Sequence, residues 1–291
     1  MTALLQDLLS QGPVITDGAW GTQLQARGLP IGEYPDTWNL SHPDEVFAVA
    51  ASYVAAGSQV ILTNTFGSNR LTLAGQGCAH KAREISKTGA QISRCAAGGF
   101  VRVFASLGPT GKMLAMGEVS ADEVLAAFVE QAEALAEGGA DAIVVETMSD
   151  LEEATLAVRA VRQVGLPVVA CLVFSSGEDN DLTLTGATAE QAAARLLDAG
   201  ADVIGTNCGR GAAEILPVCR RLAAATDLPL WVKPHAGLPK LVAGKAVYDT
   251  APADFAADAV ALVNAGADFI GGCCGTDPDF IHALAAAMGR V

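Results

Sequence analysis

The apolar residues of this 291-residue chain fall into short continuous runs that alternate with longer amphipathic stretches. One sequence pattern recurs four times: the end of an expected helix, a glycine, an apolar run and then polar or glycine residues. It occupies residues 55–66, 137–148, 198–208 and 264–274. Continuous apolar runs are typical of parallel strands covered on both faces, because a strand with one wet face would alternate. Four further runs lie at 13–18, 101–109, 166–174 and 228–234, which makes eight expected strands.

Alanine-rich stretches with good helix-capping residues separate these runs, such as 121–139 after Ser120 and 189–200 after Thr188. Strand and helix repeated eight times predict a single (β/α)8 barrel domain over residues 1–291. An open doubly wound sheet is the alternative, since periodicity alone does not separate a closed sheet from an open one. The barrel is favoured because no glycine-rich dinucleotide fingerprint follows the first run.

The charge of the chain argues against two classes of partner. Its formal net charge is −14, and no run of lysine or arginine is present that could neutralise nucleic acid or an anionic membrane surface. The first 18 residues lack a basic segment of the kind that begins a secretory signal. No uninterrupted apolar stretch approaches the roughly 18 residues that a membrane span needs. We therefore expect a cytoplasmic protein without nucleic-acid or membrane partners.

Residues with chemical potential gather where the expected strands end, which is the functional end of such a barrel. They are Asp17, Asn64, Glu146, Asn207, Cys208, His235, Cys273 and Cys274. Three thiolates with one open position would suit a catalytic zinc ion. A Gly-Gly-Cys-Cys-Gly-Thr loop packs poorly as core, and its glycines let both cysteines turn to one ion. For Cys208, Cys273 and Cys274, three alternatives to a metal site remain open: inert buried thiols, a disulfide between Cys273 and Cys274, or a redox sensor. The other four cysteines are expected to be inert and buried; they are Cys78, Cys95, Cys171 and Cys219.

Five segments carry a resemblance that covers essentially the whole chain in the right order. They are DGAWGT at 17–22, TNTFGSN at 63–69, ETM at 146–148, GTNCGRG at 205–211 and GGCCGT at 271–276. Together they resemble the homocysteine S-methyltransferase family. That family includes the homocysteine-binding module of cobalamin-dependent methionine synthase and betaine–homocysteine methyltransferase. The resemblance implies a zinc-dependent methyltransferase that forms methionine.

The resemblance also implies roles for single residues. Cys208, Cys273 and Cys274 would be the zinc ligands, with the substrate thiol as the fourth. Asp17 and Glu146 would hold the ammonium group of homocysteine, and backbone amides around Gly18 and Ala19 would receive its carboxylate. From the residues alone, Asp17 could equally cap a turn and Glu146 could belong to an ion pair in the barrel. Asn64 and Asn207 are expected to orient the substrate or the cysteines.

The identity of the methyl donor follows less directly. A small onium compound such as betaine is expected, because Trp38, with Tyr34 and Trp20, lies in or beside the long first loop, and aromatic faces attract such cations. The animal betaine enzymes carry tyrosines where this chain has Gly67 and Thr147. A methylcorrinoid protein or methyl-folate is the alternative donor, and a non-catalytic zinc- or thiol-binding barrel is the alternative function. For His235, hydrogen bonding to a ligand and a structural role are both open.

Overall fold

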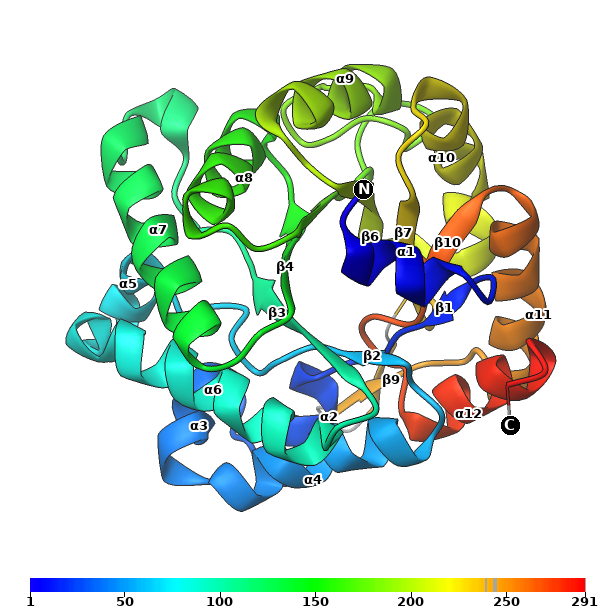
Figure 1. Ribbon diagram of the computed structural model, residues 1–291, viewed down its shortest axis with the longest axis horizontal. Helices are drawn as coiled ribbons and strands as arrows, with labels where there is room; N and C mark the ends of the chain where they lie inside the picture. The colour runs from blue at the N-terminus through cyan, green and yellow to red at the C-terminus, as the bar shows by residue number, and fades with distance from the viewer. Residues whose placement is uncertain (239, 243–244, 291) are drawn as a thin grey trace.

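The computed structural model describes residues 1–238, 240–242 and 245–290. Eight parallel strands form one sheet that curls into a nearly closed barrel (Figure 1). They are β1 (Val14–Ile15), β2 (Val60–Ile61), β3 (Arg102–Leu107), β4 (Ala142–Met148), β5 (Val168–Leu172), β6 (Val203–Gly211), β7 (Leu230–His235) and β10 (Ala267–Ile270). The order along the sheet is β1, β10, β7, β6, β5, β4, β3, β2. A doubly wound sheet reverses this order part-way, and the described strands do not, so the expected barrel is confirmed.

Helices surround the barrel and alternate with its strands (Figure 1). The outer ring consists of α4 (Pro43–Ala55), α6 (Ala82–Ala97), α7 (Ala121–Glu137), α8 (Leu151–Val164), α9 (Ala189–Ala199), α10 (Ala212–Ala225), α11 (Pro252–Asn264) and α12 (Pro278–Ala287). At the start of α7, the Ser120 hydroxyl accepts a hydrogen bond from the Glu123 N–H, and the Glu123 carboxylate accepts one from the Ser120 N–H. Thr188 and Gln191 form the same reciprocal cap on α9. These bonds satisfy N–H groups that a helix start leaves free, which is why both helices begin where the sequence predicted.

The inside of the barrel is filled with side chains at its amino-terminal end. Phe104, Trp231 and Phe269 are completely buried there, and the ring centroids of Trp231 and Phe269 lie 5.3 Å apart. The first helix, α1 (Ala3–Leu9), lies across this end in Figure 1, and its Leu5 is buried in the same cluster. Because apolar packing closes this end, space for a ligand remains at the opposite end of the strands.

Backbone and side-chain hydrogen bonds join the seam between β1 and β2. The Gln59 N–H donates to the Ile15 carbonyl over 2.8 Å, and the Ile15 N–H donates to the Gln59 side-chain oxygen over 3.0 Å. Just beyond the strands, the Leu62 N–H donates to the Asp17 carboxylate over 2.7 Å. Asp17 therefore helps to close the barrel, in addition to any role in the site.

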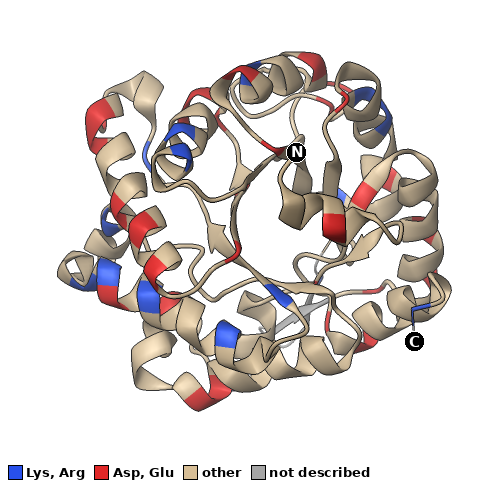
Figure 2. Cartoon of the chain, viewed as in Figure 1, with Lys and Arg blue, Asp and Glu red and all other residues tan. Residues whose placement is uncertain are grey.

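Shorter elements occupy the loops at the carboxyl ends of the strands. They are α2 (Gly21–Ala26), η1 (Pro35–Thr37), α3 (Trp38–Ser41), α5 (Arg70–Leu73), η2 (Ala74–Gln76), η3 (Ala79–Lys81), η4 (Leu114–Met116) and the antiparallel pair β8 (Lys240–Val242) and β9 (Lys245–Val247). Figure 2 shows lysine and arginine scattered among acidic residues on the outer helices; Arg83 on α6, for example, pairs with Glu133 and Glu137 on α7. None of the described helices is long and apolar enough to span a bilayer.

Candidate metal and substrate site

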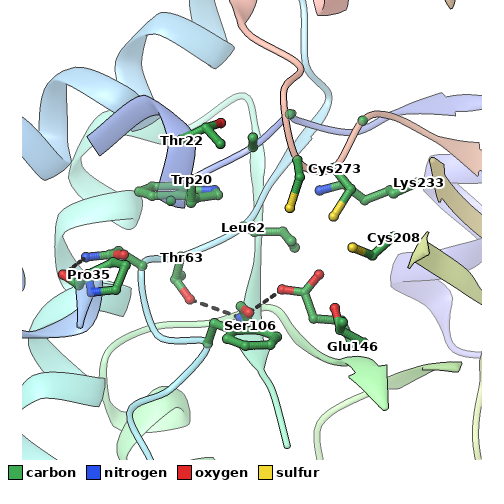
Figure 3. Close-up of a pocket in the computed structure, with 18 of the residues that line it drawn as sticks. Trp20, Thr22, Pro35, Leu62, Thr63, Ser106, Glu146, Cys208, Lys233 and Cys273 are labelled. Carbon is green, nitrogen blue, oxygen red and sulfur yellow. Dashed lines mark hydrogen bonds between the residues drawn. The ribbon is translucent and has the colours of Figure 1, made fainter. Parts of the chain in front are cut away.

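Three cysteines meet at the carboxyl end of the barrel. Cys208 belongs to β6, and Cys273 and Cys274 lie in the loop that follows β10. Their sulfur atoms all lie within 4.8 Å of one another. Figure 3 shows Cys208 from β6 and Cys273 from the loop after β10 pointing into the same cavity. The fold thus brings together the three residues that the sequence singled out as metal ligands.

Close packing fixes the loop that carries two of these cysteines. A Cβ atom at Gly272 would lie 2.3 Å from the Thr276 hydroxyl oxygen, so only glycine fits at this position. The Cys273 N–H donates to the Pro234 carbonyl over 2.8 Å, and the Thr276 hydroxyl donates to the Cys273 carbonyl over 2.7 Å. On the other strand, Cys208 has a φ of 60°, which is unusual for a residue with a side chain. Both segments therefore have unusual backbone conformations next to the cysteines, of the kind that occurs at functional sites.

The thiols strongly influence one another's ionisation. Hydrogen bonds from Cys273 and Cys274 lower the pKa of Cys208 to about 3. The hydrogen bond to Cys208 in turn raises the pKa of Cys273 to about 11, and Cys274 also has a raised pKa, chiefly through its hydrogen bond to Cys208. The cluster by itself therefore favours one thiolate shared among three sulfurs. A divalent cation would allow all three to ionise, and three soft sulfur ligands suit zinc, so the residues fit such an ion.

A cavity of about 320 Å³ opens beside the cysteines. Its wall contains apolar and aromatic groups, notably Trp20, Leu62 and Phe66, and a few polar ones. The charged and acidic side chains on this wall are Asp36, Glu146 and Lys233. A largely apolar cavity with a few polar groups is the usual form of a small-molecule site.

Asp17 is fully buried, and partners within the protein already occupy its carboxylate. One oxygen accepts a hydrogen bond from the Lys233 ammonium over 2.5 Å. The other accepts from the Trp20 indole N–H over 2.8 Å and from the Leu62 N–H over 2.7 Å. Asp17 is not among the residues that line the cavity, whereas Lys233 is. The structure thus places Asp17 behind the wall, so its expected contact with a substrate ammonium stays a prediction.

Lys233 on β7 was missed in the sequence, although a lysine inside the apolar run LPLWVKP was a usable signal. Its side chain is only 3% exposed. Burial opposes its charge, but the carboxylates of Asp17 and Glu146 outweigh that effect and raise the pKa of Lys233. The cavity wall therefore carries a positive group that the sequence reading did not include.

Glu146, at the end of β4, faces the cavity as expected (Figure 3). One of its oxygens accepts a hydrogen bond from the Ser106 hydroxyl, and the Asn207 amide nitrogen lies 3.5 Å from the other. Burial raises the pKa of Glu146 to about 7. Since its second oxygen has only this long contact, Glu146 is the acidic group best placed to meet a ligand near the cysteines.

The two asparagines hold neighbouring segments in place. The Asn207 side-chain oxygen accepts from the Thr147 N–H over 2.7 Å, and its amide nitrogen lies 4.0 Å from the Cys273 sulfur. The Asn64 amide donates to the Pro35 carbonyl over 2.7 Å and fixes the first loop. Asn207 thus joins β4, β6 and the cysteine cluster, and its expected orienting role stays a prediction. Asn64 is also one of the residues that line the cavity.

The backbone amides predicted to receive a carboxylate differ from each other. The Ala19 N–H donates to the Thr276 carbonyl over 3.1 Å and is already used. The Gly18 N–H has no hydrogen-bond partner in the described part of the chain. Gly18 and Ala19 both line the cavity. Of the two amides, that of Gly18 is the one available to a ligand.

Trp38 and His235 are not brought to this cavity. Trp38 is only 4% exposed and stacks on His42, with ring centroids 4.2 Å apart. The His235 ring nitrogen Nδ1 accepts a hydrogen bond from the Gly237 N–H over 3.0 Å, and the ring lines a separate cavity. The aromatic residues that line the cavity beside the cysteines are Trp20 and Phe66 instead.

Asp36, in the first loop, is a second acidic residue of the wall that the sequence reading missed. It is 3% exposed, and one carboxylate oxygen accepts a hydrogen bond from the Gly67 N–H over 2.9 Å. Burial raises the pKa of Asp36 to about 7. No cationic side chain among the described residues pairs with it.

The four cysteines outside the cluster differ in exposure. Cys171 and Cys219 are buried as expected, and burial raises the pKa of both thiols. Cys78 is half-buried and Cys95 is exposed, so the expectation of burial was wrong for Cys95.

Comparison with known proteins identifies the family that the sequence motifs resemble, over nearly the whole chain. The model of the family described as homocysteine S-methyltransferase matches residues 14–288. The methionine synthase of Mycobacterium leprae is 35% identical over 306 residues, which cover 98% of this chain and 25% of that protein. The methionine synthase of Mycobacterium tuberculosis is 35% identical over 307 residues, covering 99% and 25%. The chain thus spans about a quarter of the length of these relatives.

Among solved structures, the homocysteine methyltransferase MmuM from Escherichia coli has the same fold. Its metallated form superposes with a TM-score of 0.80 at 24% identity and covers 98% of both chains. Its oxidized form gives a TM-score of 0.81 at 23% identity, covering 97% of this chain and 98% of that one.

Proposed function

Because the chain belongs to the homocysteine S-methyltransferase family, we propose that it transfers a methyl group to the thiol of homocysteine and forms methionine. We propose that residues 1–291 form one catalytic domain and that it acts in the cytoplasm. The observation that carries the proposal is the meeting of three cysteine sulfurs, within 4.8 Å of one another, beside a cavity of about 320 Å³. The relatives named methionine synthase and the metallated state of MmuM support it.

Cys208, Cys273 and Cys274 would hold a zinc ion, with the acceptor thiol completing the site. When bound, zinc supplies acidity that keeps the acceptor as a thiolate near neutral pH, whereas a free thiol has a pKa of about 8.5. The new S–C bond then forms as the bond between the methyl group and its donor breaks. Hydrogen bonds from the Cys273 backbone to Pro234 and from Thr276 to that backbone keep the ligand loop in place throughout.

The amino-acid part of the acceptor would bind to the wall beside the cysteines. Glu146 would hold the ammonium group, because its second oxygen faces the cavity and has only a long contact at 3.5 Å. The Gly18 N–H would donate to the carboxylate. Asp17 would act from behind the wall, through its hydrogen bonds to Trp20 and Lys233.

For the methyl donor, we propose a small onium compound such as betaine. Trp20 and Phe66 offer aromatic faces to a cation, and Asp36 offers a buried carboxyl group on the same wall. The second candidate is a methylcorrinoid protein or methyl-folate, which the resemblance to the homocysteine-binding module of cobalamin-dependent methionine synthase favours; two relatives at 35% identity are named methionine synthase.

A donor screen with zinc-loaded protein and homocysteine tests both candidates. Betaine, dimethylsulfoniopropionate, S-methylmethionine, methyl-folate and methylcobalamin are supplied separately, and methionine is measured. Turnover that a chelator abolishes and zinc restores supports the metal-dependent reaction. Stoichiometric zinc without methionine from any donor would show a zinc- or thiol-binding barrel that is not a methyltransferase.

A further inference from the structure

Lys233 places a positive charge on the wall of the cavity that receives the acceptor thiol. We propose that this ammonium group binds the carboxylate of the acceptor and makes the site selective for thiols that carry one. The inference rests on the proposed function, since it concerns the acceptor of the same reaction. It assigns Lys233 a role in specificity in addition to its ion pair with Asp17.

Hydrogen-bonding capacity is the first reason. A lysine ammonium group has three N–H donors. One of them is used on Asp17, over 2.5 Å, and no other hydrogen bond from this ammonium is found among the described residues. Because the side chain is 3% exposed and lines the cavity, the remaining donors have little access to bulk water. An anionic group of a ligand would satisfy them.

The distribution of charge on the wall is the second reason. Lys233 and Glu146 both line the cavity, yet they do not form an ion pair within 4.0 Å in the described structure. Asp17 is held from behind by Lys233, Trp20 and the Leu62 N–H, so it does not line the cavity. Two acidic groups of the wall remain, Asp36 in the first loop and Glu146 at the end of β4, with Lys233 as the positive group. A zwitterionic amino acid complements this pattern, with its ammonium on Glu146 and its carboxylate on Lys233. Charge-assisted contacts in such a site are stronger than neutral ones.

A purely structural role for Lys233 is the competing explanation. The ion pair with Asp17 and the approach of the ammonium to the Trp231 ring, 5.9 Å from its centroid, would then account for the residue. The two explanations differ in one respect. A structural lysine affects all thiols equally, whereas a carboxylate-binding lysine affects only thiols that have a carboxylate.

The test uses three acceptors of matched length: homocysteine, 4-mercaptobutyrate without the amino group, and 3-aminopropane-1-thiol without the carboxylate. Their kcat/KM values are compared within each variant, so that a general loss of active protein cancels. In Lys233→Met, the values for the two carboxylated thiols should fall about 10- to 100-fold relative to the third, the effect of one charge-assisted hydrogen bond. In Glu146→Gln, the two amino thiols should fall relative to 4-mercaptobutyrate instead.

A matched control deals with the buried charge that Lys233→Met leaves on Asp17. The double variant Asp17→Asn with Lys233→Met has no charge at this position and should show the same loss of preference for carboxylated thiols. Asp17→Asn alone keeps the ammonium group and should keep the preference. Equal losses for all three thiols in both variants that lack Lys233 would overturn the proposal.

Calorimetric titration of the three thiols into zinc-loaded protein, without a methyl donor, separates this inference from the proposed function. A carboxylate preference that depends on Lys233 but is never followed by methionine formation would refute the function and keep the inference. Methionine formation with no such preference would refute the inference and keep the function.

Discussion

Replacing Asp17 with asparagine should destabilise the barrel itself. The carboxylate accepts hydrogen bonds from three separate segments, through Lys233 on β7, Trp20 before α2 and the Leu62 N–H after β2. Asparagine keeps one acceptor oxygen but has no charge, and its amide nitrogen cannot accept a hydrogen bond. Lys233 would then be a buried cation without its partner.

The size of the effect follows from burial. The two side chains are 0% and 3% exposed, so solvent screens the pair very little. Removing one partner of a buried ion pair costs about 3–5 kcal/mol, because the other charge stays uncompensated. In domains of this size, a change of about 1 kcal/mol shifts Tm by about 2–4 °C. We therefore expect Asp17→Asn to lower Tm by about 6–20 °C.

The assays are thermal melts, which give Tm, and urea unfolding at neutral pH, which gives the free energy of unfolding. Circular dichroism follows both for the wild type, Asp17→Asn, Lys233→Met and the double variant. If the pair acts as a unit, the double variant should lose less than the sum of the two single losses, by at least about 2 kcal/mol. An Asp17→Asn protein within about 1 kcal/mol of the wild type, or strictly additive losses, would refute this reasoning.

Three further outcomes are expected. Changing Cys208, Cys273 or Cys274 to serine should remove most bound zinc and nearly all activity while the circular dichroism spectrum stays native. The control Cys95→Ser, at an exposed site, should keep both zinc and activity. Full activity with zinc bound in a variant of the cluster would contradict the ligand role of the replaced cysteine. Trp38→Ala should lower the free energy of unfolding by about 3–5 kcal/mol, because the ring is buried against His42. The KM of onium donors should stay nearly unchanged, and a selective rise in that KM would contradict the placement of Trp38 outside the cavity. Burial raises the pKa of Asp36 from 3.8 to about 7, so the folded protein binds the carboxyl proton more tightly than the unfolded chain does. The free energy of unfolding should therefore fall as the pH rises from about 4 to about 7. In thermal melts, Asp36→Asn should reduce the fall in Tm between about pH 5 and about pH 8, and an unchanged slope would be evidence against the shift.

Features that repeat locally along the chain could be predicted from the sequence. The eight strand and helix units were predictable because residues that are close in sequence determine each apolar strand and each capped helix. The capping residues Ser120 and Thr188 began α7 and α9 as expected. The cysteine cluster was also predictable, since Cys208 lies in the last part of β6 and the Cys273–Cys274 pair follows β10, and the carboxyl ends of both strands lie at the same rim.

Features that depend on side-chain direction were not predictable in this way. Trp38 lies in a loop over the rim, but whether its ring points into the cavity depends on how the loop packs, and the ring turns to His42. Lys233 and Asp17 are 216 residues apart, so nothing local in either segment indicates their ion pair. The strand pattern could show that Lys233 is buried; only the closed barrel shows which carboxylate it meets.

The pair of Asp17 and Lys233 also changes how a loss of activity must be interpreted. Asp17 joins β1, β2 and β7 near the rim, and Lys233 carries the same connection into the cavity wall. A higher KM in Asp17→Asn would therefore not show that Asp17 touches the acceptor, because a displaced Trp20 or a less stable barrel would have the same effect. Direct contact would require that the variant keeps its stability and still loses affinity only for thiols with an amino group. Stability and acceptor preference must be measured on the same variants, because only their combination separates closure of the barrel from recognition of the substrate.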